Sequence, residues 1–168
     1  MLHFYNNTYT VAFFGHRVIS DIVYVENELE KIISKIYKEQ EYVVFLVGKD
    51  GDFDRIVSTS VKRTQRRFGK SKSSHVWVLP YLTSDLKANE KFYSDYYDEI
   101  ELATDVTGIY HYKSAFWRRN RMMVDRADLV VVYVDHKSNG AYKAYEYALK
   151  IGKNTVNLSH CPQKFREN

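Results

Sequence analysis

The sequence predicts an α/β fold: a three-layer, doubly wound and mostly parallel sheet of the Rossmann-like type. Short apolar runs alternate along the chain with longer segments whose apolar residues recur at helical spacing. Most of the short runs are continuously apolar, as expected for strands buried on both faces. We expect one domain over residues 1–168, with a core over 10–158 and a polar tail over 159–168.

The first half of the chain supplies three strands and two helices. The elements are expected, in order, as a strand over 10–14, a helix to about 39, a strand over 41–47, a helix over about 53–68 and a strand over 75–79. Ser20 or Asp21 can cap the first helix, because short polar side chains accept hydrogen bonds from the first backbone N–H groups. Pro80 ends the third strand.

The second half continues the alternation after shorter elements. We expect a short helix over 89–95, a short edge strand over 96–102, a loop over 103–110, a helix over 113–127, a strand over 129–134, a turn over 135–140, a helix over about 141–151 and a strand over 155–158. Gly152 fits the position just after the last helix, where glycine is favoured.

The composition is that of a soluble globular protein and predicts a cytoplasmic location. No apolar run approaches the roughly 18 residues of a membrane span, and the N-terminus lacks the pattern of a signal peptide. A single cysteine, Cys161, excludes an internal disulfide bond and fits a reducing compartment. No membrane partner is therefore expected.

The net charge of +4 suits an anionic ligand. Basic residues cluster toward the end of the second expected helix: Lys62, Arg63, Arg66, Arg67, Lys70 and Lys72. They could form a nucleic-acid patch or a solvated helix end whose cations suit the helix dipole. Ligands of parallel sheets bind beyond the carboxyl ends of the strands, where such helices begin. The second interpretation is therefore favoured, and nucleic acid is not expected as a partner.

Candidate binding residues follow the first two strands. Gly15-His16-Arg17 forms the first turn from strand to helix, where a phosphate commonly binds in this fold class, and Arg17 could hold a phosphate through two hydrogen bonds. Residues 48–54 (GKDGDFD) place two glycines before a helix, which can form an anion-binding nest, although three aspartates repel a bare phosphate. Both segments could also be plain turns and helix caps.

Two later segments complete the set. Arg118-Arg119-Asn120 lies in the helix before the 129–134 strand, and Ser138-Asn139-Gly140-Ala141 is a turn that opens a helix. Surface solvation for the arginines, and an ordinary turn for the second segment, are the structural alternatives.

Five segments in this order resemble the SLOG superfamily of Rossmann-like nucleotide-binding proteins, which includes the LOG enzymes and YpsA-like proteins. They are FFGHR (13–17), GKDGDFD (48–54), VWVLPY (76–81), SAFWRRNRMMVDRADLVVVYV (114–134) and SNGAYKAYEYA (138–148). The resemblance is nearest to a YpsA-like bacterial group. It implies a nucleotide or an ADP-ribose-like ligand at the strand carboxyl ends, bound by a sensor or sequestering module.

The expected ligand-binding residues lie in these segments. They are Gly15, His16, Arg17, Gly48, Gly51, Asp52, Phe53, Asp54, Pro80, Tyr81, Arg119, Asn120, Ser138, Asn139, Gly140 and Ala141. No cofactor is expected. His75, His111, His136 and His160 show no metal-ligand spacing, and Cys161 has no partner, so no metal site is predicted. The resemblance also implies a homo-oligomer.

The LOG enzymes suggest an alternative function, the hydrolysis of the N-glycosidic bond of a nucleoside 5'-monophosphate. Their catalytic arginine matches Arg119. The position of their catalytic glutamate falls on Ala144, and Glu146 is the nearby carboxylate, with Asp52 and Asp54 as further candidates. A second alternative is an interaction protein with a vestigial site.

Aromatic residues crowd the region from 81 to 117: Tyr81, Tyr93, Tyr96, Tyr97, Tyr110, Tyr112, Phe116 and Trp117. They could form a base-stacking wall, a dimer interface or part of the core. Asp98 and Glu101 lie among them and could accept hydrogen bonds from a ribose or a base.

Overall fold

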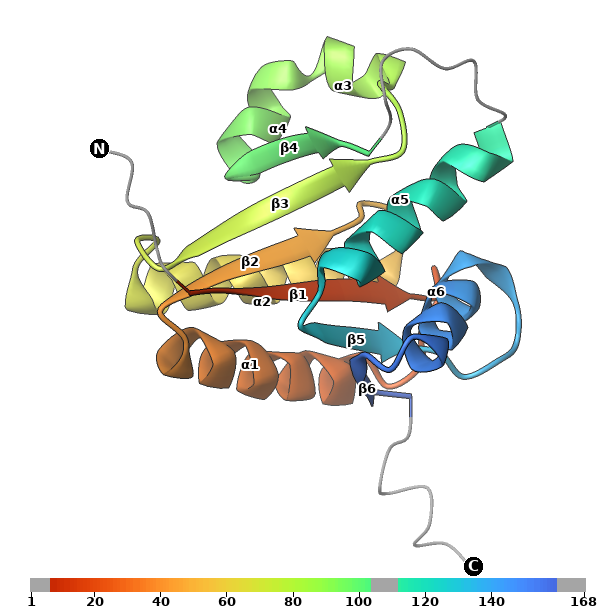
Figure 1. Cartoon of the computed structure of the whole chain (residues 1–168). Coiled ribbons are helices and arrows are strands. Elements are labelled where there is room, and N and C mark those ends of the chain that lie inside the picture. Colours follow the sequence, from red (N-terminus) through yellow and green to blue (C-terminus); the bar gives the residue numbers. More distant parts are fainter. Residues whose placement is uncertain (1–6, 104–111, 160–168) are drawn as a thin grey trace, which may run out of the picture.

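The structure is a computed structural model that describes residues 7–103 and 112–159. Strands and helices alternate along the chain (Figure 1). The elements are β1 (Thr8–Gly15), α1 (Ile22–Glu39), β2 (Tyr42–Val47), α2 (Asp52–Phe68), β3 (Ser73–Leu79), α3 (Ser84–Ala88), α4 (Glu90–Tyr96), β4 (Glu99–Leu102), α5 (Tyr112–Arg126), β5 (Leu129–Tyr133), α6 (Asn139–Lys150) and β6 (Asn154–Asn157).

One six-stranded sheet organises the molecule, in the order β4-β3-β2-β1-β5-β6. Every neighbouring pair of strands is parallel. The order runs outward from β1 in one direction through β2, β3 and β4, and in the other through β5 and β6. This reversal places the topological switch point between β1 and β5, where open α/β sheets bind their ligands. The predicted doubly wound Rossmann-like fold is confirmed.

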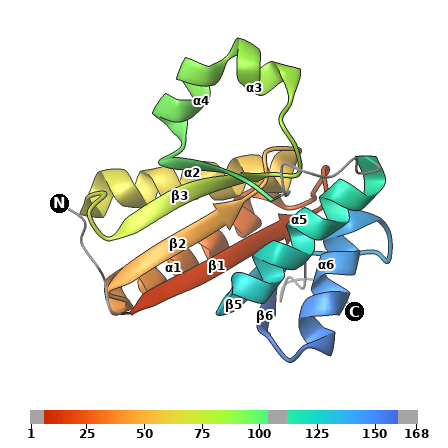
Figure 2. The ribbon, with the colours of Figure 1, turned by 45° about the horizontal axis from the view of Figure 1, so that its top comes forward.

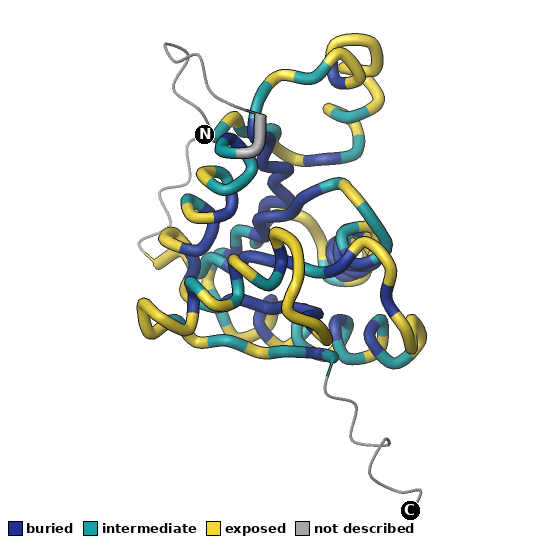
Figure 3. The backbone as a smooth tube through the Cα atoms, turned by 90° about the vertical axis from the view of Figure 1, so that its right-hand side faces the viewer, coloured by how far each residue is buried: buried dark blue, intermediate teal, exposed yellow. Residues whose placement is uncertain are grey.

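Helices cover both faces of the sheet, with α1 and α2 on one side and α5 and α6 on the other (Figure 2). Successive residues of β1 point to opposite faces. Val11 and Phe13 therefore pack in the core beneath α1 and α2, whereas Ala12 and Phe14 pack in the core beneath α5 and α6. Buried residues concentrate in the strands, and exposed ones on the outer sides of the helices (Figure 3).

The largest difference from the expected elements lies between β3 and β4. The expected helix over 89–95 is α4, and a further short helix that precedes it, α3, was missed. Thr83 caps α3, since its hydroxyl oxygen accepts a 3.1 Å hydrogen bond from the Leu86 N–H. Because α4 continues to Tyr96, only Glu99–Leu102 remains of the expected edge strand, although β4 does lie at the edge.

The start of α1 also differs from expectation. Asp21 precedes the helix in the left-handed conformation and makes no capping hydrogen bond with its side chain. The Ser20 hydroxyl instead lies 2.9 Å from the Tyr133 hydroxyl. The expected loop and tail fall almost entirely outside the described residues. Across the ranges that the structure describes, no helix is both long and apolar enough to cross a membrane.

Candidate functional site

A cavity of about 590 Å³ opens at the switch point, beyond the carboxyl ends of β1 and β5. Four segments line it: the end of β1, the loop after β2, one face of α5 and the turn before α6. Its size is within the range of small-ligand sites, roughly 300–1,000 Å³. The sequence predicted that these four segments would meet at the strand ends, and the structure brings them together.

The turn after β1 forms the floor of the cavity. A Cβ on Gly15 would lie 2.2 Å from the Phe53 ring, so only glycine fits there. His16 is 2% exposed, and its backbone N–H donates a 3.2 Å hydrogen bond to the Tyr133 carbonyl oxygen. Arg17 is exposed and lines the cavity. Its side chain is thus available to an anionic ligand.

The loop after β2 supplies Gly48 and Asp50 to the cavity wall, and the first turn of α2 supplies Asp54. A Cβ on Gly48 would lie 2.6 Å from Asp54 Oδ2, so the glycine makes room for this carboxyl group. Asp54 Oδ2 also accepts a 3.0 Å hydrogen bond from the Asp50 N–H. Burial raises the pKa of Asp54 to about 7, although the Arg119 charge pulls it down. Near neutral pH this carboxyl group can therefore donate or accept a proton.

Helix α5 presents Phe116, Arg119, Asn120 and Met123 to the cavity. The Arg119 guanidinium is held by two 2.8 Å hydrogen bonds, from Nε to Asn120 Oδ1 and from Nη1 to the Val78 carbonyl oxygen. Burial lowers the pKa of Arg119 and Asp54 opposes this shift, but an arginine stays charged. Phe116 was expected only as one ring of a possible base-stacking wall, and Met123 was not expected in the site. The helical spacing of both residues relative to Asn120 could have indicated them.

The first turn of α6 supplies Asn139, Gly140 and Ala141. Asn139 adopts a positive φ of 70°, and its Oδ1 accepts a 3.0 Å hydrogen bond from the Ala141 N–H. The Asn139 Nδ2 lies 2.9 Å from His16 Nδ1, which ties this turn to the turn after β1. The N-terminus of α6 therefore faces the cavity with its positive dipole end.

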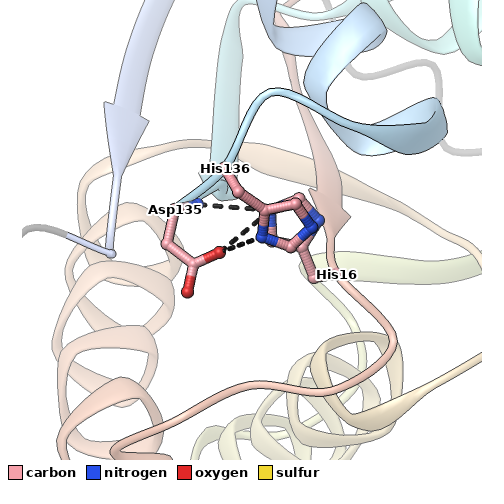
Figure 4. Close-up of side chains that lie close together, drawn as sticks. All are labelled: His16, Asp135 and His136. Atoms are coloured by element: carbon pink, nitrogen blue, oxygen red, sulfur yellow. Dashed lines mark hydrogen bonds and ion pairs between the residues drawn. The ribbon is translucent and has the colours of Figure 1, made fainter.

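His16, Asp135 and His136 form a cluster at the cavity edge (Figure 4). Asp135 Oδ1 lies 3.3 Å from His16 Nε2 and 2.5 Å from His136 Nδ1, and the two imidazole rings stack with centroids 3.7 Å apart. Burial lowers the pKa of His16 and His136 adds to this, whereas Asp135 opposes it. Three potential metal-ligand atoms lie within 4.8 Å of one another. Spacing along the chain could not indicate this group, because it joins the ends of two neighbouring strands.

Several predicted ligand residues do not line the main cavity: Gly51, Asp52, Phe53, Pro80, Tyr81 and Ser138. Phe53 is fully buried beneath Gly15. Asp52 pairs with Arg55 over 2.7 Å, and Tyr81 packs edge-to-face on Phe116. These residues support the cavity walls or lie beside them.

Glu146, the expected catalytic carboxylate, does not line the cavity either. It is exposed on α6 and accepts a 3.3 Å hydrogen bond from the Tyr142 hydroxyl. Glu146 lies two residues after the buried Ala144, so it projects from a different side of α6, away from the cavity. Among the carboxylates that the sequence offered as catalytic candidates, Asp54 is the one that lines it.

A second cavity of about 390 Å³ lies on the other side of Asp54, between the start of α2 and helix α4. Tyr93, Tyr96 and the exposed Phe92 line it, together with Lys49. Lys49 pairs with Asp85 and donates a 2.9 Å hydrogen bond to the Tyr93 hydroxyl.

The aromatic region thus separates into parts. Tyr97 is buried in the core, Trp117 packs edge-to-face on Tyr147, and Phe116 lines the main cavity. Tyr110 and the side chain of Tyr112 lie outside the described residues, as do His111, His160 and Cys161.

Asp98 and Glu101 are engaged in contacts within the protein. Asp98 Oδ2 accepts hydrogen bonds from Gln65 Nε2 over 2.7 Å and from the His75 N–H over 2.8 Å. Glu101 pairs with Arg126 over 2.6 Å. Neither lines either cavity, so the expectation that they accept hydrogen bonds from a ribose or a base finds no support.

The basic residues of α2 are largely engaged as well. Arg63 pairs with Glu26 over 2.9 Å, Lys62 donates to the Tyr96 carbonyl oxygen over 2.6 Å, and Lys70 pairs with Asp98.

No protein-family model matches this chain, and no curated protein matches it by sequence. Solved structures do resemble it. DNA processing protein A from Streptococcus pneumoniae has a TM-score of 0.63 at 19% identity, over 88% of this chain and 49% of that one. DNA processing protein A from Helicobacter pylori has a TM-score of 0.60 at 16% identity, over 88% of this chain and 63% of that one. This chain therefore spans about half to two thirds of these proteins.

A third structure, of a protein designated TM1055, has a TM-score of 0.51 at 14% identity, over 88% of this chain and 72% of that one. These likenesses show a shared Rossmann-like fold. At these identities the likeness extends to the fold alone, and it gives no support to the YpsA-like group in particular.

The expectation against nucleic acid is corrected by these comparisons. The Helicobacter pylori protein, which shares this fold, has a single-stranded DNA binding mode. The basic end of α2 alone does not decide this question, because ligands of this fold class bind at the carboxyl ends of the strands. The fold of this chain is thus one that is also found in a DNA-binding protein.

Proposed function

We propose that this chain is a binding module for a phosphate-bearing nucleotide ligand, which it holds in the cavity at the switch point. The observation that carries the proposal is the convergence of four separate chain segments, contributing Arg17, Gly48, Arg119 and Gly140, on one cavity. The function is that of a sensor or sequestering module.

The chemistry of the cavity suits such a ligand. Arg17 and Arg119 supply positive charge, and the N-terminus of α6 adds its dipole. Because its pKa is about 7, Asp54 is partly protonated at neutral pH and repels a phosphate less than an ordinary aspartate does. The apolar side chains of Phe116 and Met123 offer a surface for a base or sugar.

A free nucleotide and a nucleotide unit of single-stranded DNA present the same phosphate, sugar and base. We would measure binding by calorimetry for AMP, ADP-ribose, inorganic phosphate and a short oligothymidylate. Tight binding of the oligonucleotide alone would assign the cavity to single-stranded DNA, whereas binding of AMP or ADP-ribose would assign it to a small molecule. If no member of this panel bound, the proposal would be wrong.

Arg17→Ala tests the role of the β1 turn in this binding. We expect affinity for the best ligand to fall by about 1–3 kcal/mol, the contribution of a charge-assisted hydrogen bond. Stability should change little, because Arg17 is exposed. Lys35→Ala on the exposed side of α1 is the matched control and should bind as the wild type does. Equal affinity of Arg17→Ala and the wild type would remove Arg17 from the site.

The proximity of Asp54 and Arg119 favours a second candidate, hydrolysis of the N-glycosidic bond of a nucleoside 5'-monophosphate. A carboxyl group with a pKa near 7 can act as a general acid or base, or as a carboxylate that stabilises the oxocarbenium-like transition state. Arg119 would hold the phosphate.

Chromatography for free base after incubation with nucleoside monophosphates tests this activity. Asp54→Asn and Arg119→Lys should each abolish base release, whereas Glu146→Gln should leave it unchanged. Loss of activity in Glu146→Gln alone would contradict this assignment.

A further inference from the structure

The cluster of His16, Asp135 and His136 has a donor set suited to a metal ion. Two imidazoles and one carboxylate place three ligand atoms within 4.8 Å of one another, at the ends of the neighbouring strands β1 and β5 (Figure 4). We propose that these three side chains bind one divalent transition-metal ion of the Zn²⁺ class at the edge of the main cavity.

His16 is the buried ligand of this site. Its Nδ1 lies 2.9 Å from Asn139 Nδ2, and its Nε2 lies 3.2 Å from the backbone nitrogen of Asp135. An ion on Nε2 takes the place of the Asp135 N–H and leaves the ring proton on Nδ1. The Asn139 amide must then turn its oxygen to that proton and give up its hydrogen bond from the Ala141 N–H. A partner on the second ring nitrogen is the usual way in which proteins orient a metal-binding histidine.

The distance between His16 and Asp135 suits a shared ion. His16 Nε2 and Asp135 Oδ1 are 3.3 Å apart. Two ligands of a tetrahedral zinc ion with bonds of about 2.1 Å are separated by roughly 3.4 Å. The separation of these two atoms therefore matches a shared ion, which displaces the Asp135 backbone N–H from Nε2.

His136 must move to complete the site. Its ring now stacks on His16, and its Nδ1 lies 2.5 Å from Asp135 Oδ1. An ion lies in the plane of each imidazole that binds it, so two stacked rings cannot both coordinate one ion. The side chains of His136 and Asp135 are 54% and 45% exposed, which leaves room for His136 to turn its nitrogen to an ion that replaces the hydrogen bond.

The donor set also predicts which metal binds. Imidazole nitrogen favours Zn²⁺, Co²⁺ and Ni²⁺, whereas Mg²⁺ and Ca²⁺ require more oxygen ligands than a single carboxylate provides. Three protein ligands leave a coordination position open, and both histidines line the cavity. A ligand phosphate could occupy that position, a point that rests on the proposed function, whereas the metal site itself does not.

The test uses the full chain without nucleotide. Donors outside the described residues are first removed in a background variant that carries His3→Gln, His111→Gln, His160→Gln and Cys161→Ser. We expect calorimetry to show one Zn²⁺ per chain in this background, and Co²⁺ to give the absorption bands of a bound ion. In the same background, Asp135→Asn and His136→Gln should each weaken Zn²⁺ binding at least tenfold, while Asp95→Asn on the exposed side of α4 should not.

Circular dichroism confirms that each variant is folded, which is expected because Asp135 and His136 are exposed. Absence of Zn²⁺ binding in the background variant, or equal binding after His136→Gln, would overturn the metal site. Preferential binding of Mg²⁺ would do so as well. Nucleotide binding in the presence of a chelator would remain as evidence for the proposed function, so the two proposals can fail separately.

Discussion

The backbone N–H of Asp52 donates a 2.8 Å hydrogen bond to the carbonyl oxygen of Arg17. This bond joins the turn after β1 to the first residue of α2. Gly51 makes the approach geometrically feasible, because a Cβ at this position would lie 2.5 Å from the Arg17 Cα. The position of Arg17 in the cavity therefore depends on a glycine in a different loop.

Replacing Gly51 with alanine should displace the Arg17 turn. The residue has a φ of +106°, so alanine adds backbone strain to its overlap with Arg17, and we expect a loss of about 2–4 kcal/mol in the free energy of unfolding. Gly69→Ala is the matched control, since Gly69 has a φ of +96° but no atom within 4 Å of the added Cβ. It should cost only the strain, about 1–2 kcal/mol. Urea denaturation measures both, and equal losses would show that the contact with Arg17 is unimportant.

Gly15 and Phe53 should be coupled energetically. An alanine Cβ at position 15 would overlap the Phe53 ring, which is fully buried, so Gly15→Ala should destabilise the fold by about 2–4 kcal/mol. A Phe53→Ala background removes the two nearest atoms, Cγ at 2.2 Å and Cδ1 at 2.3 Å, and leaves only Cβ at 2.5 Å. The same substitution should cost at least about 1 kcal/mol less there. Denaturation of the four proteins gives the coupling energy. Simple additivity of the two substitutions would refute the overlap.

The sequence predicted the fold well because the strands of this sheet are buried on both faces. Runs such as LVVVY over β5 can only be interior strands, and the helices between them follow from their periodicity. The helix α3 was missed because five residues are too few to show helical spacing, and its capping by Thr83 is a local hydrogen bond.

The site was predicted in part, for a physical reason. Residues directly after a strand, such as Gly15, Arg17 and Gly48, have positions fixed by the sheet, and they line the cavity as expected. Side chains on helices depend on the rotation of the helix, which explains why Glu146 points elsewhere. The stacking of His16 on His136 requires the order of the strands, since only that order places β1 beside β5.

The pKa of Asp54 should give the stability a measurable dependence on pH. The folded value, about 7, lies above the ordinary value of 3.8, so the protonated carboxyl group stabilises the fold and this contribution is lost as pH rises from about 4 through 7. Asparagine at this position cannot ionise. As pH rises through this range, the free energy of unfolding of Asp54→Asn should therefore increase by about 1–3 kcal/mol relative to that of the wild type. Solvent in the cavity keeps this change below the full effect of the pKa shift.

Asp85→Asn serves as the control for Asp54→Asn. Hydrogen bonds from Lys49 and Tyr93 lower the pKa of Asp85 to about 2, so its titration affects stability below about pH 4. Between pH 5 and 8 the difference in stability between this variant and the wild type should therefore be constant. A constant difference for Asp54→Asn over that range would mean that Asp54 is ionised throughout.

His75 should produce the opposite dependence on pH. It is fully buried, its Nε2 lies 3.0 Å from the Ser58 hydroxyl, and burial lowers its pKa to about 4 from the ordinary 6.5. The neutral imidazole stabilises the fold above pH 6.5, and this contribution is lost as pH falls toward 4. His75→Leu removes this titration. As pH falls over this range, the wild type should lose about 1–3 kcal/mol of its free energy of unfolding relative to His75→Leu.

Asp54 and His75 oppose each other between about pH 4 and 6.5, so the wild type should show a flatter stability profile than either single variant. As pH falls, the free energy of unfolding of His75→Leu should rise, because Asp54 takes up a proton more readily in the folded state. That of Asp54→Asn should fall, because His75 takes up a proton more readily in the unfolded state. The double variant should again be flat. Urea denaturation at half-unit pH steps resolves these slopes, and slopes of the same sign in the two single variants would show that one of the two groups titrates near its ordinary pKa.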